Sequence, residues 1–437
     1  MTRPLVFRRG AALAVLLAAA LAPRLAAQAG GAPVVTLAEA RRRAATTDPG
    51  VAAARGELNT AAWERRAATA DLVTPNLSAT TNYTAYNDPF FSFTGSPSTT
   101  TSTAQVQATY TLLGSGKFAE LRRSRASLAT AEANAEVAGY RAALAADAAY
   151  YGVLAEGELS RVAAERLRRA QEQLGIARVR VQAGETIATD SLQLVLEVNR
   201  ARLGVVQRDS ALAVARLRLG RLIGLTGPAE AAPVDSAPPP ALPLTLEEAS
   251  AELRARGPEL EAVRAAERQA DATVAAQRSQ YLPTVSLGAS WSAYDSEFFP
   301  TFLERKAVAV TVSLPLWDAG RRELAFARSR GRRAAARALR EDRERWAAEA
   351  MAQTWHGYQA ARAGIDLALV GVQASAETYR VQGARYREGA TTILDLLEAQ
   401  VALGEAEAAL VQSRHAARLS LAQIEALLGR RLFTDNR

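Results

Sequence analysis

One short motif occurs twice in this chain, about half a chain apart. The first copy spans residues 180–193 and the second spans 385–400, and each copy joins two long stretches of helix-forming composition. Equivalent residues lie 205 positions apart. We interpret the chain as a tandem duplication with two matching helical hairpin tips, and duplicated tips indicate an assembly with a repeated opening. The shared residues are Arg180, Gly184, Thr186 and Asp190 in the first copy, and Arg385, Gly389, Thr391 and Asp395 in the second.

The duplication extends over almost the whole chain. Thr36-Leu37-Ala38-Glu39-Ala40 matches Thr245-Leu246-Glu247-Glu248-Ala249, and Leu222-Ile223-Gly224 matches Leu427-Leu428-Gly429. A segment rich in Pro and Ala separates the halves. The pattern predicts a first repeat over 30–226, a linker over 227–243 and a second repeat over 244–437.

The first 29 residues have the pattern of a secretory signal peptide. Three arginines precede an apolar run from Ala11 to Ala22, and Ala27-Gln28-Ala29 is a small-x-small cleavage site. The chain has no cysteine, so an exported protein of this sequence has neither disulfides nor a thiolate metal site. No later segment reaches 18 uncharged apolar residues, so any membrane crossing must use strands.

Each half is expected to contain four helices. These lie near 37–47, 49–73, 117–183 and 190–225 in the first half, and near 246–256, 258–281, 320–388 and 394–429 in the second. The longest stretches are rich in Ala, Leu, Arg and Glu and contain no proline, a strongly helix-forming composition. A helix of 67 residues is roughly 100 Å long, which indicates a coiled coil or an extended tube. A long soluble coiled coil fits the helices equally well.

Four segments between the helices alternate with period two, as strands do. They lie near 76–86, 103–113, 284–294 and 306–317 and form two hairpins, with loops over 87–102 and 295–305. One face of each is apolar, the other is polar and uncharged, and aromatic residues lie along or near the strand ends. Each run has about ten residues, enough for a tilted strand to cross a bilayer. A half-buried soluble sheet is the alternative.

Four strands cannot close a barrel by themselves, because an open edge in lipid leaves backbone groups unpaired. Several chains must then share one barrel. Two chains supply eight strands, whose interior side chains would fill, whereas three supply twelve and leave a lumen. A conduit therefore favours three chains.

The order of helices and strands, the duplication and the tip motif together resemble the TolC family of outer-membrane efflux proteins. In the second tip the motif includes Arg385, Tyr386, Gly389, Asp395 and Gln400. The first tip departs from it, with Val181, Leu194 and Val195 where the second has Tyr386, Ala399 and Gln400.

The resemblance implies a mainly α fold with a transmembrane β part, namely a TolC-like trimeric α/β-barrel with four strands and long coiled-coil helices per chain. It further implies a homotrimer in the outer membrane of a Gram-negative-type cell, in contact with outer-membrane lipid and with its helices in the periplasm. The expected function is a passive exit duct of a tripartite efflux or type I secretion system, whose partners are a periplasmic membrane-fusion adaptor and an inner-membrane transporter. The alternative is a soluble periplasmic coiled-coil scaffold or adaptor protein.

The tips are the candidate functional site. Asp190 and Asp395 lie near the start of the return helices, where they can cap a helix or form a ring of carboxylates at the pore entrance. Glu185 and Glu388 add to that ring or are solvated. Arg180 and Arg385 tie neighbouring helices through carboxylates or meet the adaptor. The tip turns and adaptor contact are assigned to Gly184, Gly389, Thr186 and Thr391.

No catalytic, cofactor or metal residues are assigned, because no phosphate loop or metal-ligand cluster stands out. The net charge is +8, of which the signal peptide contributes four arginines. The remaining basic residues are interleaved with Glu along helices, which is typical of solvated faces and not of a nucleic-acid surface. We therefore expect neither an enzyme nor a nucleic-acid partner.

Overall fold

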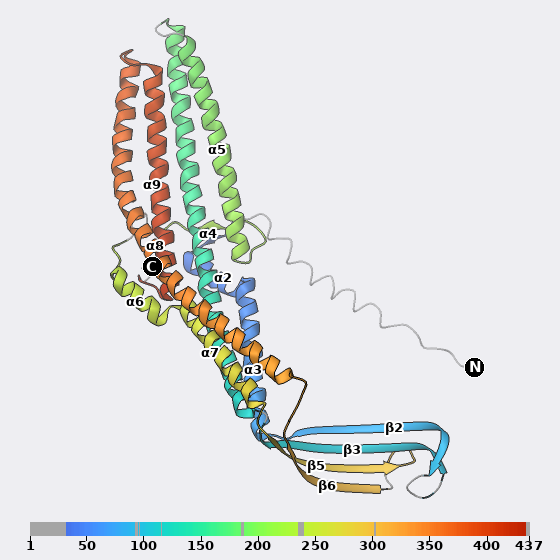
Figure 1. Ribbon diagram of the computed structural model, residues 1–437. Coiled ribbons are helices and arrows are strands. Elements are labelled where there is room, and N and C mark those ends of the chain that lie inside the picture. Colours follow the sequence, from blue (N-terminus) through green and yellow to red (C-terminus); the bar gives the residue numbers. More distant parts are fainter. Residues whose placement is uncertain are drawn as a thin grey trace, which may run out of the picture. The chain divides into compact units, whose positions relative to one another are not determined.

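The computed structural model describes residues 32–91, 95, 97–114, 116–184, 188–234, 240–300 and 303–433. The predicted signal peptide, 1–29, lies outside these residues. Within them, no helix is both long enough and apolar enough to cross a membrane. The predicted repeat boundaries stay a prediction, although the same order of elements occurs in both halves (Figure 1).

The helices agree with expectation to within a few residues. The first half contains α2 (Leu37–Thr47), α3 (Pro49–Val73), α4 (Lys117–Gln182) and α5 (Ala188–Leu222). The second half contains α6 (Leu246–Arg256), α7 (Pro258–Ser279), α8 (Arg321–Arg387) and α9 (Ile393–Leu428). Proline occupies the first position of α3 and α7, where the missing N–H costs nothing.

The strands β2 (Asn76–Phe91), β3 (Pro97–Leu113), β5 (Thr284–Asp295) and β6 (Leu303–Ser313) form one antiparallel sheet. Its order is β2-β3-β5-β6. The register pairs Leu77 with Ala108, Ala108 with Ala289, and Ala289 with Val308. Since directly paired residues share a face, the apolar faces predicted for the four segments coincide on one side of the sheet.

The expected limits of the first loop and of the fourth strand were wrong. The segment 87–102 was expected to be a loop, but β2 continues to Phe91 and β3 begins at Pro97, after a register shift between Ala85 and Phe90. The fourth strand was expected over 306–317, but it begins at Leu303 and ends at Ser313. Pro315 follows and cannot donate a ladder hydrogen bond, which accounts for the earlier end.

The chain forms two compact units, each drawing residues from both halves. Unit 1 holds residues up to 44, 145–238 and 364–415, and unit 2 holds 45–144, 239–363 and the residues from 416 onward. Unit 2 therefore contains the sheet and the helix ends attached to it. Unit 1 contains both hairpin tips.

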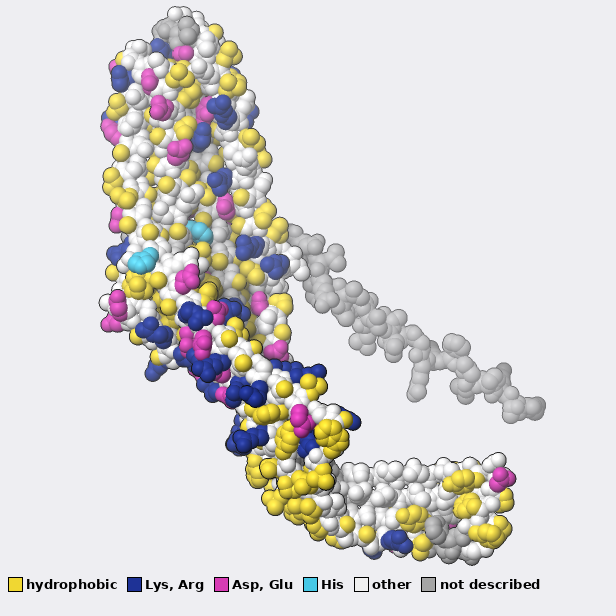
Figure 2. Space-filling view, viewed as in Figure 1, with side chains coloured by type: hydrophobic (Ala, Val, Ile, Leu, Met, Phe, Trp, Pro, Cys, Tyr) yellow, Lys and Arg dark blue, Asp and Glu magenta, His cyan; other side chains and the backbone are white. Residues whose placement is uncertain are grey.

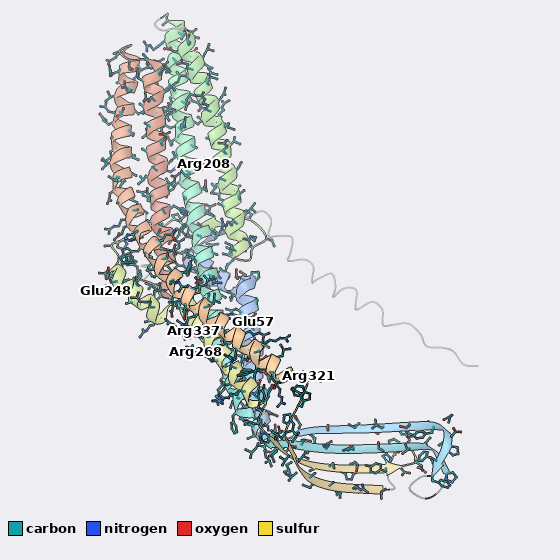
Figure 3. The ribbon with its side chains drawn as sticks, viewed as in Figure 1. Glu57, Arg208, Glu248, Arg268, Arg321 and Arg337 are labelled. Atoms are coloured by element: carbon teal, nitrogen blue, oxygen red, sulfur yellow. The ribbon has the colours of Figure 1, made fainter. Side chains whose placement is uncertain are left out.

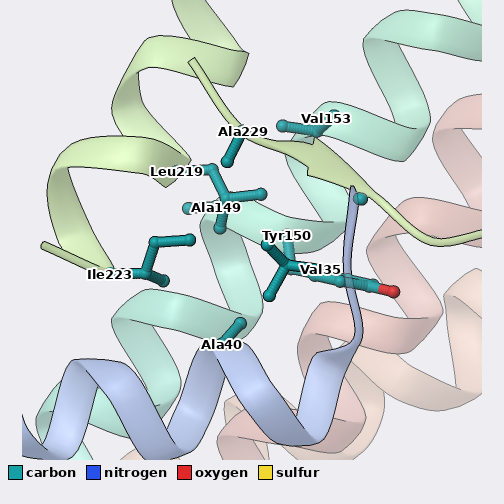
Figure 4. Close-up of a cluster of buried hydrophobic side chains, with 9 residues drawn as sticks. Val35, Ala40, Ala149, Tyr150, Val153, Leu219, Ile223 and Ala229 are labelled. Atoms are coloured by element: carbon teal, nitrogen blue, oxygen red, sulfur yellow. The ribbon is translucent and has the colours of Figure 1, made fainter. Parts of the chain in front are cut away.

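A core of unit 1 lies around a two-stranded parallel sheet, β1 (Val34–Val35) with β4 (Glu230–Ala231) (Figure 4). Val35 and Leu219 are buried there, and the hydroxyl of buried Tyr150 donates to the Ala232 carbonyl at 2.7 Å. A strand at the start of the described chain thus pairs with the Pro/Ala-rich segment between the halves. In unit 2, a second core packs Met351, Trp355 and Tyr358 of α8 against α6, α7 and α9.

Candidate functional site: the hairpin tips

Each hairpin tip turns at a glycine with a left-handed backbone. Gly184 has φ +77° and Gly389 has φ +74°, values that cost other L-residues about 1–2 kcal/mol. At the second tip, the Ala390 N–H donates to the Arg385 carbonyl at 2.9 Å, and the Gly389 N–H donates to the Tyr386 carbonyl at 3.1 Å. This pair of bonds is the Schellman arrangement, which satisfies the last carbonyls of α8.

The return helix α9 starts with a capping box. The Asp395 carboxylate accepts from the Thr392 N–H at 3.0 Å, while the Thr392 hydroxyl accepts from the Asp395 N–H at 3.3 Å. The same carboxylate accepts from the hydroxyls of Thr391 (2.8 Å) and Thr392 (2.7 Å). Hydrogen bonds from Thr392 and then Thr391 hold the pKa of Asp395 below its usual value. Asp395 is therefore an ionised helix cap at neutral pH.

The two tips are joined through Tyr386, which is 2% exposed. The Tyr386 hydroxyl, on α8, donates to Oδ2 of Asp190, in the first turn of α5, at 3.4 Å. The guanidinium of Arg180, on α4, donates to the Tyr386 carbonyl and lies 5.3 Å from its ring centroid. Burial, followed by the charge of Asp190, raises the pKa of Tyr386, so its hydroxyl stays protonated and can donate.

The two copies of the motif therefore act differently. Arg180 reaches across to the second hairpin, whereas Arg385 donates to the Ala390 carbonyl of its own turn at 3.3 Å. Glu388 is exposed at the tip. Glu185 and Thr186, expected at the first tip, lie outside the described residues.

Below the tips the four helices enclose an apolar cluster and a buried charge. Leu194, Leu396 and Ile393 pack with Tyr386. Arg166 of α4 binds Oε1 of buried Glu197 on α5 through Nε (3.0 Å) and Nη2 (2.7 Å). The fully buried Gln400 of α9 donates to the Arg166 carbonyl at 3.4 Å.

Sequence reasoning missed two of these contacts. Tyr386 was noted in the motif without a partner, and Glu197 was not noted. The signal for Tyr386 is the asymmetry of the repeat, since Val181 occupies its place in the first copy and cannot make a reciprocal hydrogen bond. In the described part of the chain, no group of three or more His, Asp or Glu residues could hold a metal ion.

Comparison with known proteins identifies the family that has this architecture. The family model of the outer membrane efflux protein matches residues 40–225 and 249–430, which is most of the chain. The chain belongs to the outer membrane efflux protein family. The TolC-like fold and the outer-membrane location expected from the sequence are thereby confirmed.

Individual relatives are distant. Protein CyaE of Bordetella pertussis is 28% identical over 260 residues, which cover 58% of this chain and 54% of that protein. Outer membrane efflux protein BepC of Brucella suis is 27% identical over 277 residues, covering 61% and 59%. The chain thus spans just over half the length of these curated relatives. The CmeC outer membrane channel of Campylobacter jejuni has the same fold, with a TM-score of 0.79 at 15% identity over 90% of this chain and 85% of that one.

Proposed function

We propose that three copies of this chain form a passive exit duct through the outer membrane, which opens at the hairpin tips. The edges of the sheet, unpaired among the described residues, are the evidence for an assembly of three copies. Its outer strands, β2 and β6, each pair with only one neighbour within the described chain. Twelve strands from three chains would pair every edge, as a strand structure in lipid requires.

The observation that carries the proposal is the tie across the two tips. Tyr386 joins α8 to α5 through Asp190 and to α4 through Arg180. These helices belong to different hairpins, so separating the hairpins would break these contacts. We propose that the tied arrangement is the closed entrance, and that opening splays one hairpin from the other.

The carboxylates fit this proposal in different ways. Asp190 takes part in the tie, and Asp395 caps α9 while it remains exposed. We propose that Asp395 and Glu388 also give the entrance a negative rim that favours cations. Exposed Arg385 and the turn residues Gly184, Gly389 and Thr391 are proposed adaptor contacts. A periplasmic adaptor and an inner-membrane transporter complete the proposed system and supply its energy.

Cysteine cross-linking tests the shared sheet. The chain has no cysteine, so introduced cysteines are the sole thiols. Leu77 on β2 and Val308 on β6 are exposed on the same face at opposite edges of the sheet. A Leu77→Cys/Val308→Cys variant, treated in outer membranes with thiol cross-linkers of graded length, should give linked dimers and trimers. The control variant Leu77→Cys/Leu192→Cys, in which Leu192 lies exposed on α5, should give no linked dimers or trimers. If only monomers appear at every linker length, three copies do not share a sheet.

A further inference from the structure

The four helix ends that lead into the sheet carry an unusual concentration of arginine. Residues 63–73, 117–126, 270–279 and 318–333 contain thirteen Lys and Arg against six Asp and Glu. At the opposite end of the sheet, residues 86–100 and 295–306 contain two basic and four acidic residues. The two ends of the sheet thus carry opposite net charge, and the helix end is strongly positive.

Most of these cations have no acidic partner in the described structure. Five of the thirteen form an ion pair with an acidic side chain or lie over an aromatic ring, for example Lys117 with Asp71 and Arg322 with Asp318. The other eight are exposed and make no ion pair with any described residue. We name these eight the arginine belt: Arg65, Arg122, Arg125, Arg278, Arg321, Arg328, Arg330 and Arg332. Figure 3 labels Arg321 at the start of α8, beside the connection from β6.

An apolar surface lies between the belt and the strands. It consists of exposed residues at the helix–strand connections, including Leu316 at 84%, Trp317 at 80% and Phe118 at 68% exposure. Figure 2 shows hydrophobic side chains gathered where the helices meet the sheet, with Lys and Arg side chains on the helices beyond them. We name this surface the apolar collar: Val73, Leu113, Phe118, Leu282, Leu314, Leu316 and Trp317.

Collar and belt have the spacing of a bilayer interface. Arg278 and Arg321 lie within one turn of the helix ends, and Arg122 and Arg125 lie five and eight residues into α4. At 1.5 Å per residue these four lie within about 12 Å of the collar. The headgroup region of a bilayer is about 5–8 Å thick, and arginine side chains can extend several ångströms along an apolar surface to reach it.

We propose that the arginine belt binds the headgroups of anionic phospholipids in the membrane leaflet nearest the helices. The guanidinium fork suits a phosphate oxygen pair, and the adjacent collar supplies the contact with acyl chains that a soluble polyanion would not use. The inference rests on the proposed function, because it needs the sheet to lie in the membrane. It adds a lipid preference that the duct by itself does not require.

Tryptophan quenching measures this preference directly. The full chain is reconstituted in vesicles of phosphatidylethanolamine with one fifth phosphatidylglycerol, in which either lipid carries brominated acyl chains. Exposed Trp317, in the collar, reports which lipid lies beside it once Trp63, Trp291, Trp346 and Trp355 are replaced by phenylalanine. This single-tryptophan chain serves as the wild-type background. Each Arg near an anionic surface favours it about fivefold, so quenching per brominated phosphatidylglycerol molecule should exceed that per phosphatidylethanolamine at least about twofold. High salt should reduce the ratio toward one.

The variant R122Q/R125Q/R278Q/R321Q removes the four charges nearest the collar and should bring the ratio to about one. The control R161Q/R178Q/R200Q/R202Q removes four exposed arginines of α4 and α5 in unit 1 and should keep the wild-type ratio. Equal quenching by both lipids in the wild type, or a preference that survives in the belt variant, would overturn the lipid preference and leave the duct intact. Absence of quenching by either lipid would overturn both.

Discussion

Replacing Tyr386 by phenylalanine tests the tie between the hairpins with the smallest possible change. The substitution deletes one hydroxyl from a buried ring and leaves no sizeable cavity. The Arg180 guanidinium should keep its two contacts with residue 386, since one goes to the backbone carbonyl and the other to the ring face. The loss is the hydrogen bond to Asp190.

The size of the effect follows from that bond. At 3.4 Å the bond is longer than the usual O–H···O range of about 2.5–3.0 Å, so we assign it a net contribution of about 1 kcal/mol per chain, below the value of about 1.5–3 kcal/mol typical of a charged acceptor. One kilocalorie per mole shifts a closed–open equilibrium about fivefold. If the three ties of a trimer must break together, the shift becomes about 3 kcal/mol, or on the order of a hundredfold.

Planar-bilayer recording of the purified channel checks this expectation. Tyr386→Phe should raise the time spent in the open state, with no gross loss of thermal stability. The matched control is Tyr379→Phe, because the Tyr379 hydroxyl of α8 accepts from Gln173 of α4 at 3.3 Å, two turns below the tip, whereas the Tyr386 hydroxyl bonds to α5. Open probability that is the same for wild type, Tyr386→Phe and Tyr379→Phe would refute a gate at Tyr386.

Three further predictions concern stability. Arg41→Met should destabilise unit 1 by about 3–5 kcal/mol in denaturant unfolding, because it removes the cation that binds the buried Asp147 carboxylate through bonds of 2.5 and 2.8 Å; an unchanged midpoint would contradict that role. The depressed pKa of Asp395 means that its cap stabilises α9 at any pH above the usual carboxyl value of 3.8 and is lost as pH falls through the lowered pKa. The protection of the first amides of α9 against hydrogen exchange, corrected for the intrinsic rate at each pH, should therefore fall in acid in the wild type, and Asp395→Asn should show the lower protection already at neutral pH. Gly389→Ala should cost about 1 kcal/mol through its left-handed backbone, measured by thermal unfolding against Gly371→Ala, a site in the middle of α8 with open space around it.

Much of the secondary structure was predictable because local signals decided it. Pro49 and Pro258 mark helix starts, and the absence of proline through both long segments permits the longest helices. Alternation identified the four strands and their apolar face. It failed at 87–91 and 97–102, where Ser, Thr, Pro and Asn suggested a loop, because pairing between the two strands overrode these weak local preferences.

The position of the candidate site was predictable from the sequence, but the side-chain contacts within it were not. The repeated glycines fixed where the chain turns, and Thr392 with Asp395 carries a capping pattern within four residues. The link from Tyr386 to Asp190 and Arg180 joins residues about 200 positions apart. No local pattern specifies which faces of four near-equivalent helices meet, so this link had to come from the packed structure.

The sequence by itself therefore determined the duplication, the helices, the strands and the two turns, since each depends on propensity and periodicity within a short window. Only the tertiary structure decided that the equivalent arginines of the two tips make different contacts. Arg180 serves the opposite hairpin and Arg385 serves its own turn, although both occupy the same place in the motif. The physical reason is that a side chain's role depends on the partner packed against it, and the first tip offers Val181 where the second offers Tyr386.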